Sequence, residues 1–213
     1  VAQYTKSKHC IGLNSGTDAL MMGLHAMGIG KGDEVITSPI SFIATTAAIA
    51  HVGATPVIVD IEENSWCISP NEIEKAITKK TSAIIPVHIY GQPASMDKIC
   101  EIGKRYNIPI IEDCAEAHGA SFNNVPVGSI GTIGCFSFFA NKIMTTGEGG
   151  MCTTNSKEIL EKVIDVTTDG IKLIKHPYLF YIRAMAKTNL SYEEEYKNDE
   201  ESIKYKELIK DEK

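Results

Sequence analysis

The chain has 213 residues, of which 43% are hydrophobic and 23% are charged, and its formal net charge is −6. This composition is ordinary for a globular protein, and the length is enough to bury a sizeable core. The negative charge argues against a nucleic-acid partner, because nucleic acid calls for a basic face. No apolar run approaches the roughly 20 residues of a membrane-spanning helix, so we expect no membrane partner.

The six cysteines are scattered along the chain, without a Cys-x-x-Cys pair and without a Cys/His set at metal-ligand spacing. Several lie inside apolar runs, where cysteine behaves as a small hydrophobic residue. We therefore expect reduced thiols, no metal site and a cytoplasmic location. The first residues also lack the charged-then-apolar pattern of a signal peptide.

Apolar strand-like runs alternate with helix-like segments as far as residue 113. The expected strands cover residues 10–14, 34–38, 55–61, 82–89 and 108–113. The expected helices cover residues 17–29, 41–53, 69–80 and 95–107. The third helix begins with Ser69 as its N-cap and Pro70 at the first helical position. Repeated strand–helix alternation with nearly continuous apolar strands predicts an α/β fold with a mostly parallel sheet covered by helices.

The pattern changes after residue 134. "GCFSFF" and "GGMCTTN" predict two closely spaced strands on either side of a loop, and a helix is expected over residues 156–166. Residues 191–213 are rich in charge and poor in apolar side chains, as in a solvated helix or a disordered tail. We expect residues 1–170 to form one large domain and residues 171–213 a divergent C-terminal region with a charged tail.

The segment "NSGTDAL" (14–20) places a helix start directly after a strand. Ligands of open α/β sheets bind beyond the carboxyl ends of strands, and the free N–H groups of a helix N-terminus suit phosphate. Gly16 and Thr17 are therefore candidates for phosphate binding. The alternative is a simple N-cap, for which serine and threonine are common whatever the function.

The segment "IIEDCAEAHGA" (110–120) places acidic residues at the end of a buried strand. Asp113 could meet a cofactor nitrogen at this edge, or it could cap the segment that follows. Glu116 and His118 could be further site groups. They could equally be a solvated carboxylate and a hydrogen-bonded structural histidine.

The segment "CFSFFANKIMTTGEGG" (135–150) holds one lysine, Lys142, between an aromatic run and a glycine-rich turn. A lone lysine in a loop is most often a solvated charge. Pyridoxal phosphate, however, needs a lysine amine for its Schiff base, a carboxylate facing its ring nitrogen and a cradle for its phosphate. The candidates for these parts and for an aromatic face are Lys142, Asp113, Gly16 and Thr17 with Ser137, and Phe42 in "SPISFIATT".

Taken together, these segments resemble the DegT-type sugar-nucleotide aminotransferases from residue 1 to about residue 165. The motifs that carry the resemblance are "LNSGTDAL", "GKGDEVITSPISFIATTAAI", "GATPVIVDI", "AIIPVHIYGQPASMDKI", "IIEDCAEAHGA" and "GCFSFFANKIMTTGEGGM". The resemblance implies the large-domain fold of type I pyridoxal phosphate enzymes. "EDCAEAHGA" and "FSFFANKIMTTGEGG" are most similar to the GDP-perosamine synthase subfamily, which moves an amino group from glutamate to GDP-4-keto-6-deoxymannose.

The resemblance also implies a role for each matching residue. Lys142 matches the Schiff-base lysine, Asp113 the partner of the ring nitrogen, and Phe42 the side chain stacked on the ring. Gly16, Thr17 and Ser137 match phosphate contacts, Glu116 lies beside the cofactor hydroxyl where many relatives have glutamine, and His118 falls near the sugar. The implied partners are a nucleotide sugar, an amino-acid donor and a second copy of the chain.

The match fails in three places. The family normally begins before Val1 and continues past Lys213 into a smaller domain, so we expect the N-terminal segment and the small domain to be missing here. Residues 176–190 read "HPYLFYIRAMAKTNL", where the family has a Gly-Tyr-Asn-Tyr-Arg run whose asparagine reaches the neighbouring subunit's phosphate.

Two hypotheses follow from this comparison of motifs. The first is a pyridoxal phosphate-dependent sugar aminotransferase, and the second is a catalytically inactive large-domain fragment that acts as a binding or pairing module. A dinucleotide-binding protein, suggested by "GIGKG" (28–32), is disfavoured because that run follows a helix and not a strand.

Overall fold

A computed structural model of the chain describes residues 1–174. Val1–Val163 form one compact unit, and a second unit begins at Ile164. The expected charged tail and the divergent run at 176–190 lie outside the described residues, and the expected domain boundary at residue 170 stays a prediction.

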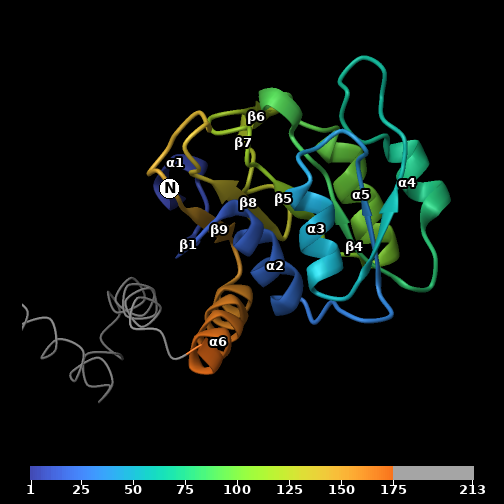
Figure 1. Ribbon diagram of the computed structural model, residues 1–213. Helices are drawn as coiled ribbons and strands as arrows, with labels where there is room; N and C mark the ends of the chain where they lie inside the picture. The colour runs from blue at the N-terminus through green and yellow to red at the C-terminus, as the bar shows by residue number, and fades with distance from the viewer. Residues whose placement is uncertain (175–213) are drawn as a thin grey trace, which may run out of the picture. The chain divides into compact units, whose positions relative to one another are not determined.

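The sheet has two halves that adjoin at its centre (Figure 1). One half has the strand order β1 (His9–Leu13), β9 (Gly150–Thr154), β8 (Ile133–Ser137) and β5 (Ile111–Asp113). The other has the order β3 (Thr55–Ile58), β2 (Glu34–Thr37) and β4 (Thr81–Ile85). Parallel bridges Ile84–Ile110 and Val87–Asp113 join β4 to the β5 segment. All these neighbours are parallel except β9, which is antiparallel to both β1 and β8, so the predicted mostly parallel sheet is confirmed.

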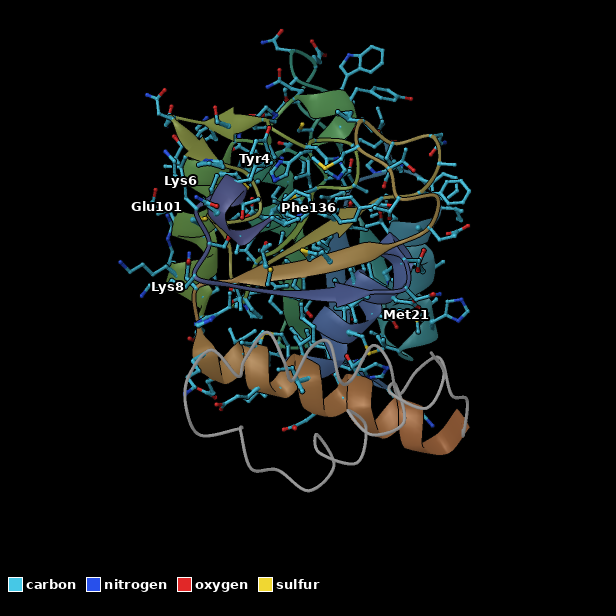
Figure 2. All side chains as sticks on the ribbon, turned by 90° about the vertical axis from the view of Figure 1, so that its left-hand side faces the viewer. Tyr4, Lys6, Lys8, Met21, Glu101 and Phe136 are labelled. Atoms are coloured by element: carbon cyan, nitrogen blue, oxygen red, sulfur yellow. The ribbon has the colours of Figure 1, made fainter. Side chains whose placement is uncertain are left out.

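Helices cover the sheet on both faces. The helical elements of the described residues are α1 (Ala2–Thr5), α2 (Gly16–Ala26), α3 (Ala44–His51), α4 (Pro70–Ala76), the 3₁₀ turn η1 (Ile89–Gly91), α5 (Met96–Tyr106) and α6 (Lys157–Ile174). Helix α2 packs on β8 and β9, and α3 packs on α2 and β3. Consecutive residues Val35 and Ile36 of β2 are both fully buried, as expected for a strand covered on each face. Figure 2 shows Tyr4 of α1 and Met21 of α2 on opposite sides of β1 and β9.

A large buried cluster joins α4 and α5 to the parallel half of the sheet. Ile73 of α4 and Met96 and Ile99 of α5 pack in one cluster with Ile36 of β2 and Ile84 of β4. Each of these side chains is fully buried. Burial of such a side chain contributes about 1.5–3 kcal/mol, so this cluster stabilises the packing of α4 and α5 against β2 and β4.

Several expected boundaries are wrong for identifiable reasons. Strand β4 ends at Ile85 and does not reach residue 89, since Pro86 has no N–H to continue the ladder. The strand expected from 108 begins at Ile111, after Pro109. Helix α4 has the expected Ser69 N-cap but ends at Ala76, and α3 begins at Ala44, three residues late.

Two further elements differ from expectation in the second half of the chain. Helix α6 runs to Ile174, beyond the expected end at residue 166. The hairpin of β6 (Ser121–Phe122) and β7 (Val125–Pro126) was not predicted at all. Its signal is the Asn123–Asn124 pair, because both asparagines adopt positive φ angles of 50° and 64°, as a tight hairpin turn requires. Among the helices described, none is long and apolar enough to cross a bilayer.

The sheet topology brings distant parts of the sequence to one edge. Strands β1, β5 and β8 run parallel, so Leu13, Asp113 and Ser137 end at the same side of the sheet. Strand β9 runs the other way and therefore starts at this side, with Gly150. Gly149 also forms a bridge with Ser15, just before α2 begins. This edge, at the carboxyl ends of the parallel strands, is where ligands of such sheets bind.

Candidate active site

Lys142 lies in the loop between β8 and β9, at the carboxyl edge of the sheet. The loop is closed by the Phe138 N–H, which donates to the Gly149 carbonyl at 2.8 Å, and the Lys142 N–H donates to the Phe139 carbonyl at 3.0 Å. Gly147 and Gly149 adopt positive φ angles of 85° and 144°, which a side chain would strain. The glycine-rich turn therefore lets the chain reverse within a few residues of Lys142.

The Lys142 amine points toward two other predicted site residues. Its Nζ lies 3.4 Å from Glu116 Oε1 and 5.8 Å from the centroid of the Phe42 ring. The Lys142 side chain is 13% exposed, although the loop that carries it is largely exposed. The Lys142 side chain is therefore mostly shielded from solvent and in contact with other residues. Phe42 itself is exposed over 67% of its surface, so one face of its ring is open.

Asp113 ends β5 and is held by two donors. Its Oδ2 accepts a 2.7 Å hydrogen bond from the Thr45 hydroxyl, and its Oδ1 accepts the Ala115 N–H at 3.1 Å. Burial raises the pKa of Asp113, and the Thr45 hydroxyl, the Ala115 N–H, His88 and Lys142 oppose that rise in this order. A buried carboxylate with spare acceptor capacity is a fitting partner for a cationic nitrogen.

The start of α2 packs directly against β8. A Cβ atom on Gly16 would lie 2.6 Å from Ser137 Cβ, and one on Gly150 would lie 1.9 Å from the Ser15 carbonyl oxygen. Only glycine permits this approach, which brings Ser137 beside the first turn of α2 that also contains Thr17. Ser15 caps this helix by accepting the Asp18 N–H at 3.0 Å, so the N-cap alternative holds for Ser15 and leaves Gly16 and Thr17 free for another role.

His118 is placed apart from these contacts. Its ring packs between Phe136 and Phe138, with centroids 5.5 and 5.2 Å away. Burial lowers the pKa of His118, and the charge of Lys142 adds to that shift. Neither ring nitrogen has a hydrogen-bond partner among the described residues, so the interpretation of His118 as a hydrogen-bonded structural histidine is not supported.

The structure adds residues that the sequence analysis did not select. Thr45 and Ser41 form a short hydroxyl chain beside Asp113, with 2.6 Å between their Oγ atoms. The main-chain N–H of Tyr90, which has a positive φ of 49°, lies 3.4 Å from Glu116 Oε2. The sequence could have indicated Thr45, because it lies one helical turn after Ser41 in "SFIATT". Nothing in the sequence indicated a role for Tyr90.

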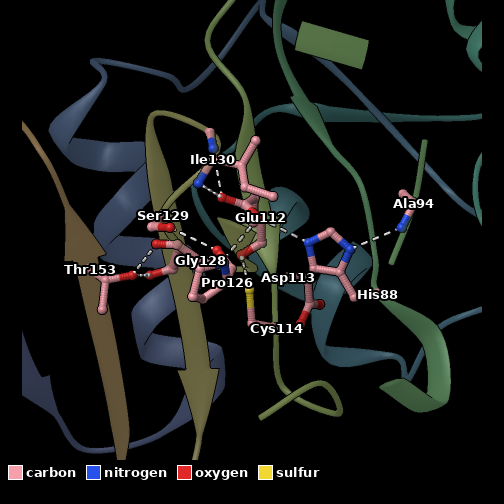
Figure 3. Close-up of polar contacts among 12 residues, drawn as sticks. His88, Ala94, Glu112, Asp113, Cys114, Pro126, Gly128, Ser129, Ile130 and Thr153 are labelled. Atoms are coloured by element: carbon pink, nitrogen blue, oxygen red, sulfur yellow. Dashed lines mark hydrogen bonds and ion pairs between the residues drawn. The ribbon is translucent and has the colours of Figure 1, made fainter. Parts of the chain in front are cut away.

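A second acidic group, Glu112, lies on the other face of β5 (Figure 3). Its carboxylate accepts the N–H groups of Gly128, Ile130 and Gly131 at 2.8, 2.9 and 2.6 Å. His88 Nε2 lies 3.0 Å from Glu112, and His88 Nδ1 accepts the Ala94 N–H at 3.1 Å. Since Nδ1 is an acceptor, Nε2 carries the proton and donates to Glu112.

The donor atoms of His88, Glu112 and Cys114 lie within 4.8 Å of one another, which is a possible spacing for a metal site. Both His88 nitrogens and both Glu112 oxygens are already used in hydrogen bonds. Burial raises the pKa of the Cys114 thiol well above its usual value, which disfavours the thiolate that binds metal. This trio is therefore a structural network.

A cavity of about 660 Å³ opens at the opposite edge of the sheet, where the parallel strands begin. Its lining includes Asp33 and Ser82, which bond to each other at 2.6 Å. None of the predicted site residues lines it. The "GIGKG" run contributes Gly28 to its wall and forms the turn between α2 and β2, as expected for a run that follows a helix.

Comparison with known proteins identifies the family of the chain. The family model of the DegT/DnrJ/EryC1/StrS aminotransferases matches residues 1–190. The chain is 48% identical over 162 residues to the GDP-perosamine synthase of Caulobacter vibrioides, covering 76% of this chain and 44% of that protein. It is 47% identical over 171 residues to the UDP-N-acetyl-3-dehydro-alpha-D-glucosamine 3-aminotransferase of Acidithiobacillus ferrooxidans, covering 80% and 46%.

A solved structure, NtdA from Bacillus subtilis with bound cofactor PMP, matches with a TM-score of 0.72 and 37% identity. That match covers 77% of this chain and 37% of the other. The chain thus spans less than half the length of each of these relatives. Because the family model covers most of the sequence, the chain belongs to the DegT/DnrJ/EryC1/StrS aminotransferase family, which depends on pyridoxal phosphate and includes sugar aminotransferases.

Proposed function

We propose that this chain binds pyridoxal phosphate and takes part in transferring an amino group, from glutamate, to a nucleotide-linked 4-keto-6-deoxy sugar. The observation that carries the proposal is the convergence of Lys142, Glu116 and Phe42 at the sheet edge where Asp113 and Ser137 end their strands. A lysine amine, a buried carboxylate, an open aromatic face and a glycine-lined helix start are the parts that this cofactor needs.

The chain's residues fit the cofactor in four roles. Lys142 would hold it covalently through Nζ and then carry a proton on that atom. Asp113 would keep the ring nitrogen protonated, since its spare acceptor capacity is buried. Gly16 and Thr17 at the start of α2, with Ser137, would hold the phosphate. Phe42 would cover one face of the ring. When bound, the cofactor supplies an electron sink for negative charge on the substrate carbon.

The sugar specificity is the finer part of the proposal. Support for a perosamine-like substrate comes from the GDP-perosamine synthase of Caulobacter vibrioides, at 48% identity. The aminotransferase of Acidithiobacillus ferrooxidans, whose name gives a UDP-linked 3-dehydro sugar, is 47% identical. Sugar-nucleotide class is therefore supported more strongly than the particular sugar. His118 is the candidate for a sugar contact on the resemblance of its motif alone.

We further propose that the chain acts as a homodimer in the cytoplasm. Phe42, Ile43 and Ile143 expose large apolar surfaces at or near the site, which suits contact with a second copy. All six cysteines are free thiols, which suits a reducing compartment. Light scattering of the purified chain checks the dimer, and a monomer at micromolar concentration would contradict it.

Cofactor attachment tests the proposal directly. The chain is incubated with pyridoxal phosphate, its visible absorption is recorded, and the adduct is reduced with borohydride and mapped by mass spectrometry. We expect one modified residue, Lys142, and loss of the adduct in Lys142→Ala but not in the control Lys79→Ala, whose lysine is exposed. Label spread over surface lysines would contradict the proposal.

If Lys142 is labelled, production of 2-oxoglutarate from glutamate then tests amino transfer. Absence of 2-oxoglutarate would mean that the chain binds the cofactor without transferring an amino group.

A further inference from the structure

Asp113 receives one side-chain hydrogen bond, from the buried hydroxyl of Thr45. Thr45, in the first turn of α3, is 1% exposed, and its hydroxyl lies 2.7 Å from Asp113 Oδ2. The neighbouring Thr46 uses its hydroxyl differently, donating to the Ile43 carbonyl at 3.1 Å within its own helix. The hydroxyl of Thr45 therefore bonds to Asp113, whereas the hydroxyl of the adjacent Thr46 bonds within its own helix.

The direction of the hydrogen bonds can be assigned. A hydroxyl has one proton, and Thr45 gives its proton to the Asp113 carboxylate. The 2.6 Å contact between Ser41 and Thr45 must then use the Ser41 proton, with Thr45 as the acceptor. Ser41, Thr45 and Asp113 therefore form a chain in which both protons point toward the carboxylate. Donors aligned in this way strengthen one another and favour the ionised form of the group at the end.

We propose that Thr45 is a positioning residue for the Asp113 carboxylate, and that Ser41 orients the Thr45 hydroxyl. The pair keeps Asp113 ionised and fixed in one orientation, so that its remaining acceptor capacity can face a cationic ring nitrogen. This inference rests on the proposed function for the identity of the ligand, and on the hydroxyl chain alone for its effect on Asp113.

The surroundings of Asp113 make this support necessary. Burial raises the pKa of Asp113, and Thr45 makes the largest opposing contribution, ahead of the Ala115 N–H. The charged or titratable groups around it are His88 on the β4 side, Lys142 from the loop after β8, and the thiols of Cys114 and Cys135. His88 and Lys142 lower the pKa of Asp113 less than Thr45 and the Ala115 N–H do, and the thiols are neutral because burial raises the pKa of each. Thr45 is thus the main side chain that holds the charge.

The test compares Thr45→Val, which is close in shape and lacks the hydroxyl, with Thr45→Ser, which keeps it, and with the matched control Thr46→Val. The first readout is the ¹³C NMR titration of the Asp113 carboxyl in the 213-residue chain without cofactor, assigned with Asp113→Asn. We expect the midpoint to rise in Thr45→Val and to stay at the wild-type position in Thr45→Ser and Thr46→Val. An unmoved midpoint in folded Thr45→Val would overturn the proposal.

The second readout is the dissociation constant for pyridoxal phosphate from absorption titration. Thr45→Val should weaken binding by about tenfold or more, the effect of losing a hydrogen bond to a charged group, while the two other variants stay within about twofold. If Thr45→Val fails to fold, Ser41→Ala takes its place with a smaller rise in the Asp113 midpoint, and no rise there would overturn the proposal. If wild type binds no cofactor but the midpoint still shifts, the proposed function fails while the role of Thr45 toward Asp113 stands.

Discussion

The two faces of β5 carry neighbouring carboxylates that the fold treats differently. Glu112 and Asp113 are adjacent, so their side chains point to opposite faces of the sheet. Glu112 is fully buried and receives four donors, which is about the capacity of a carboxylate. Asp113 is nearly as buried but receives only two. The number of donors supplied, and not burial, separates the structural carboxylate from the one available to a ligand.

The difference also has a cause in the backbone. The donors to Glu112 come mainly from the Gly128–Gly131 turn before β8, which folds around its carboxylate (Figure 3). Asp113 faces the first turn of α3, and there the Thr45 hydroxyl, not a main-chain N–H of the helix, donates to it. A saturated carboxylate stabilises the fold, whereas an unsaturated one retains affinity for a cation at some cost in stability.

Removal of the saturated carboxylate should have the largest effect. Glu112→Ala leaves three buried or half-buried N–H groups and the His88 proton without their acceptor, so we expect a loss of about 3–5 kcal/mol in the free energy of unfolding. Urea denaturation followed by circular dichroism measures this loss. Glu101→Ala is the control, because Glu101 is an exposed residue of α5 that pairs with Arg105 and with no other charged group in residues 1–174, and it should cost less than about 1 kcal/mol. Equal losses in the two variants would contradict the structural role of Glu112.

Removal of the Asp113 carboxylate should weaken cofactor binding strongly and change stability little. Asp113→Asn should weaken pyridoxal phosphate binding by about 100-fold, as expected when one partner of a buried charge pair is removed. The same change should raise the free energy of unfolding of the cofactor-free chain at neutral pH by up to about 1 kcal/mol, because a poorly solvated charge disappears and one hydrogen bond is lost with it. Absorption titration and urea denaturation give the two values.

The stability difference between wild type and Asp113→Asn should depend on pH, and the sign of this dependence follows from the pKa of Asp113. The pKa of Asp113 is raised in the folded state, chiefly by burial, so the folded chain holds this proton more tightly than the unfolded chain. The cost of the ionised carboxylate is fully present above the raised pKa and disappears as the pH falls through it. The stability difference between wild type and Asp113→Asn should therefore shrink as the pH is lowered from neutral. A difference that grows on acidification would contradict the assignment.

The sequence was sufficient for most of the elements and for which segments meet at the candidate site, because strand ends and helix starts set which residues lie at an edge. Lys142, Glu116 and Phe42, from three separate segments, meet as the motifs predicted. The antiparallel course of β9 and the saturation of Glu112 could not be predicted, since both depend on pairings between segments far apart in the chain. Thr45 was missed for the same reason, because a threonine in a helix is ordinary until its partner is known.

The contact between Glu116 and Lys142 offers a smaller effect that separates the site from the rest of the fold. Glu116→Gln removes the carboxylate that lies 3.4 Å from the Lys142 ammonium while keeping an oxygen acceptor there. The Glu116 side chain is 25% exposed, so the free energy of unfolding should change by less than about 1 kcal/mol. Lys142 Nζ thereby loses the carboxylate contact that it must break before it can attack the cofactor. Borohydride-trapped adduct at Lys142 should then form up to about fivefold faster at neutral pH, because an ion pair of this kind is worth at most about 1 kcal/mol.

A control, Glu158→Gln, removes a surface partner of Lys162 and should leave that rate unchanged. A slower reaction in Glu116→Gln would mean that the carboxylate assists attachment instead of competing with it, and Glu116 would then belong with Asp113 among the carboxylates that the site uses.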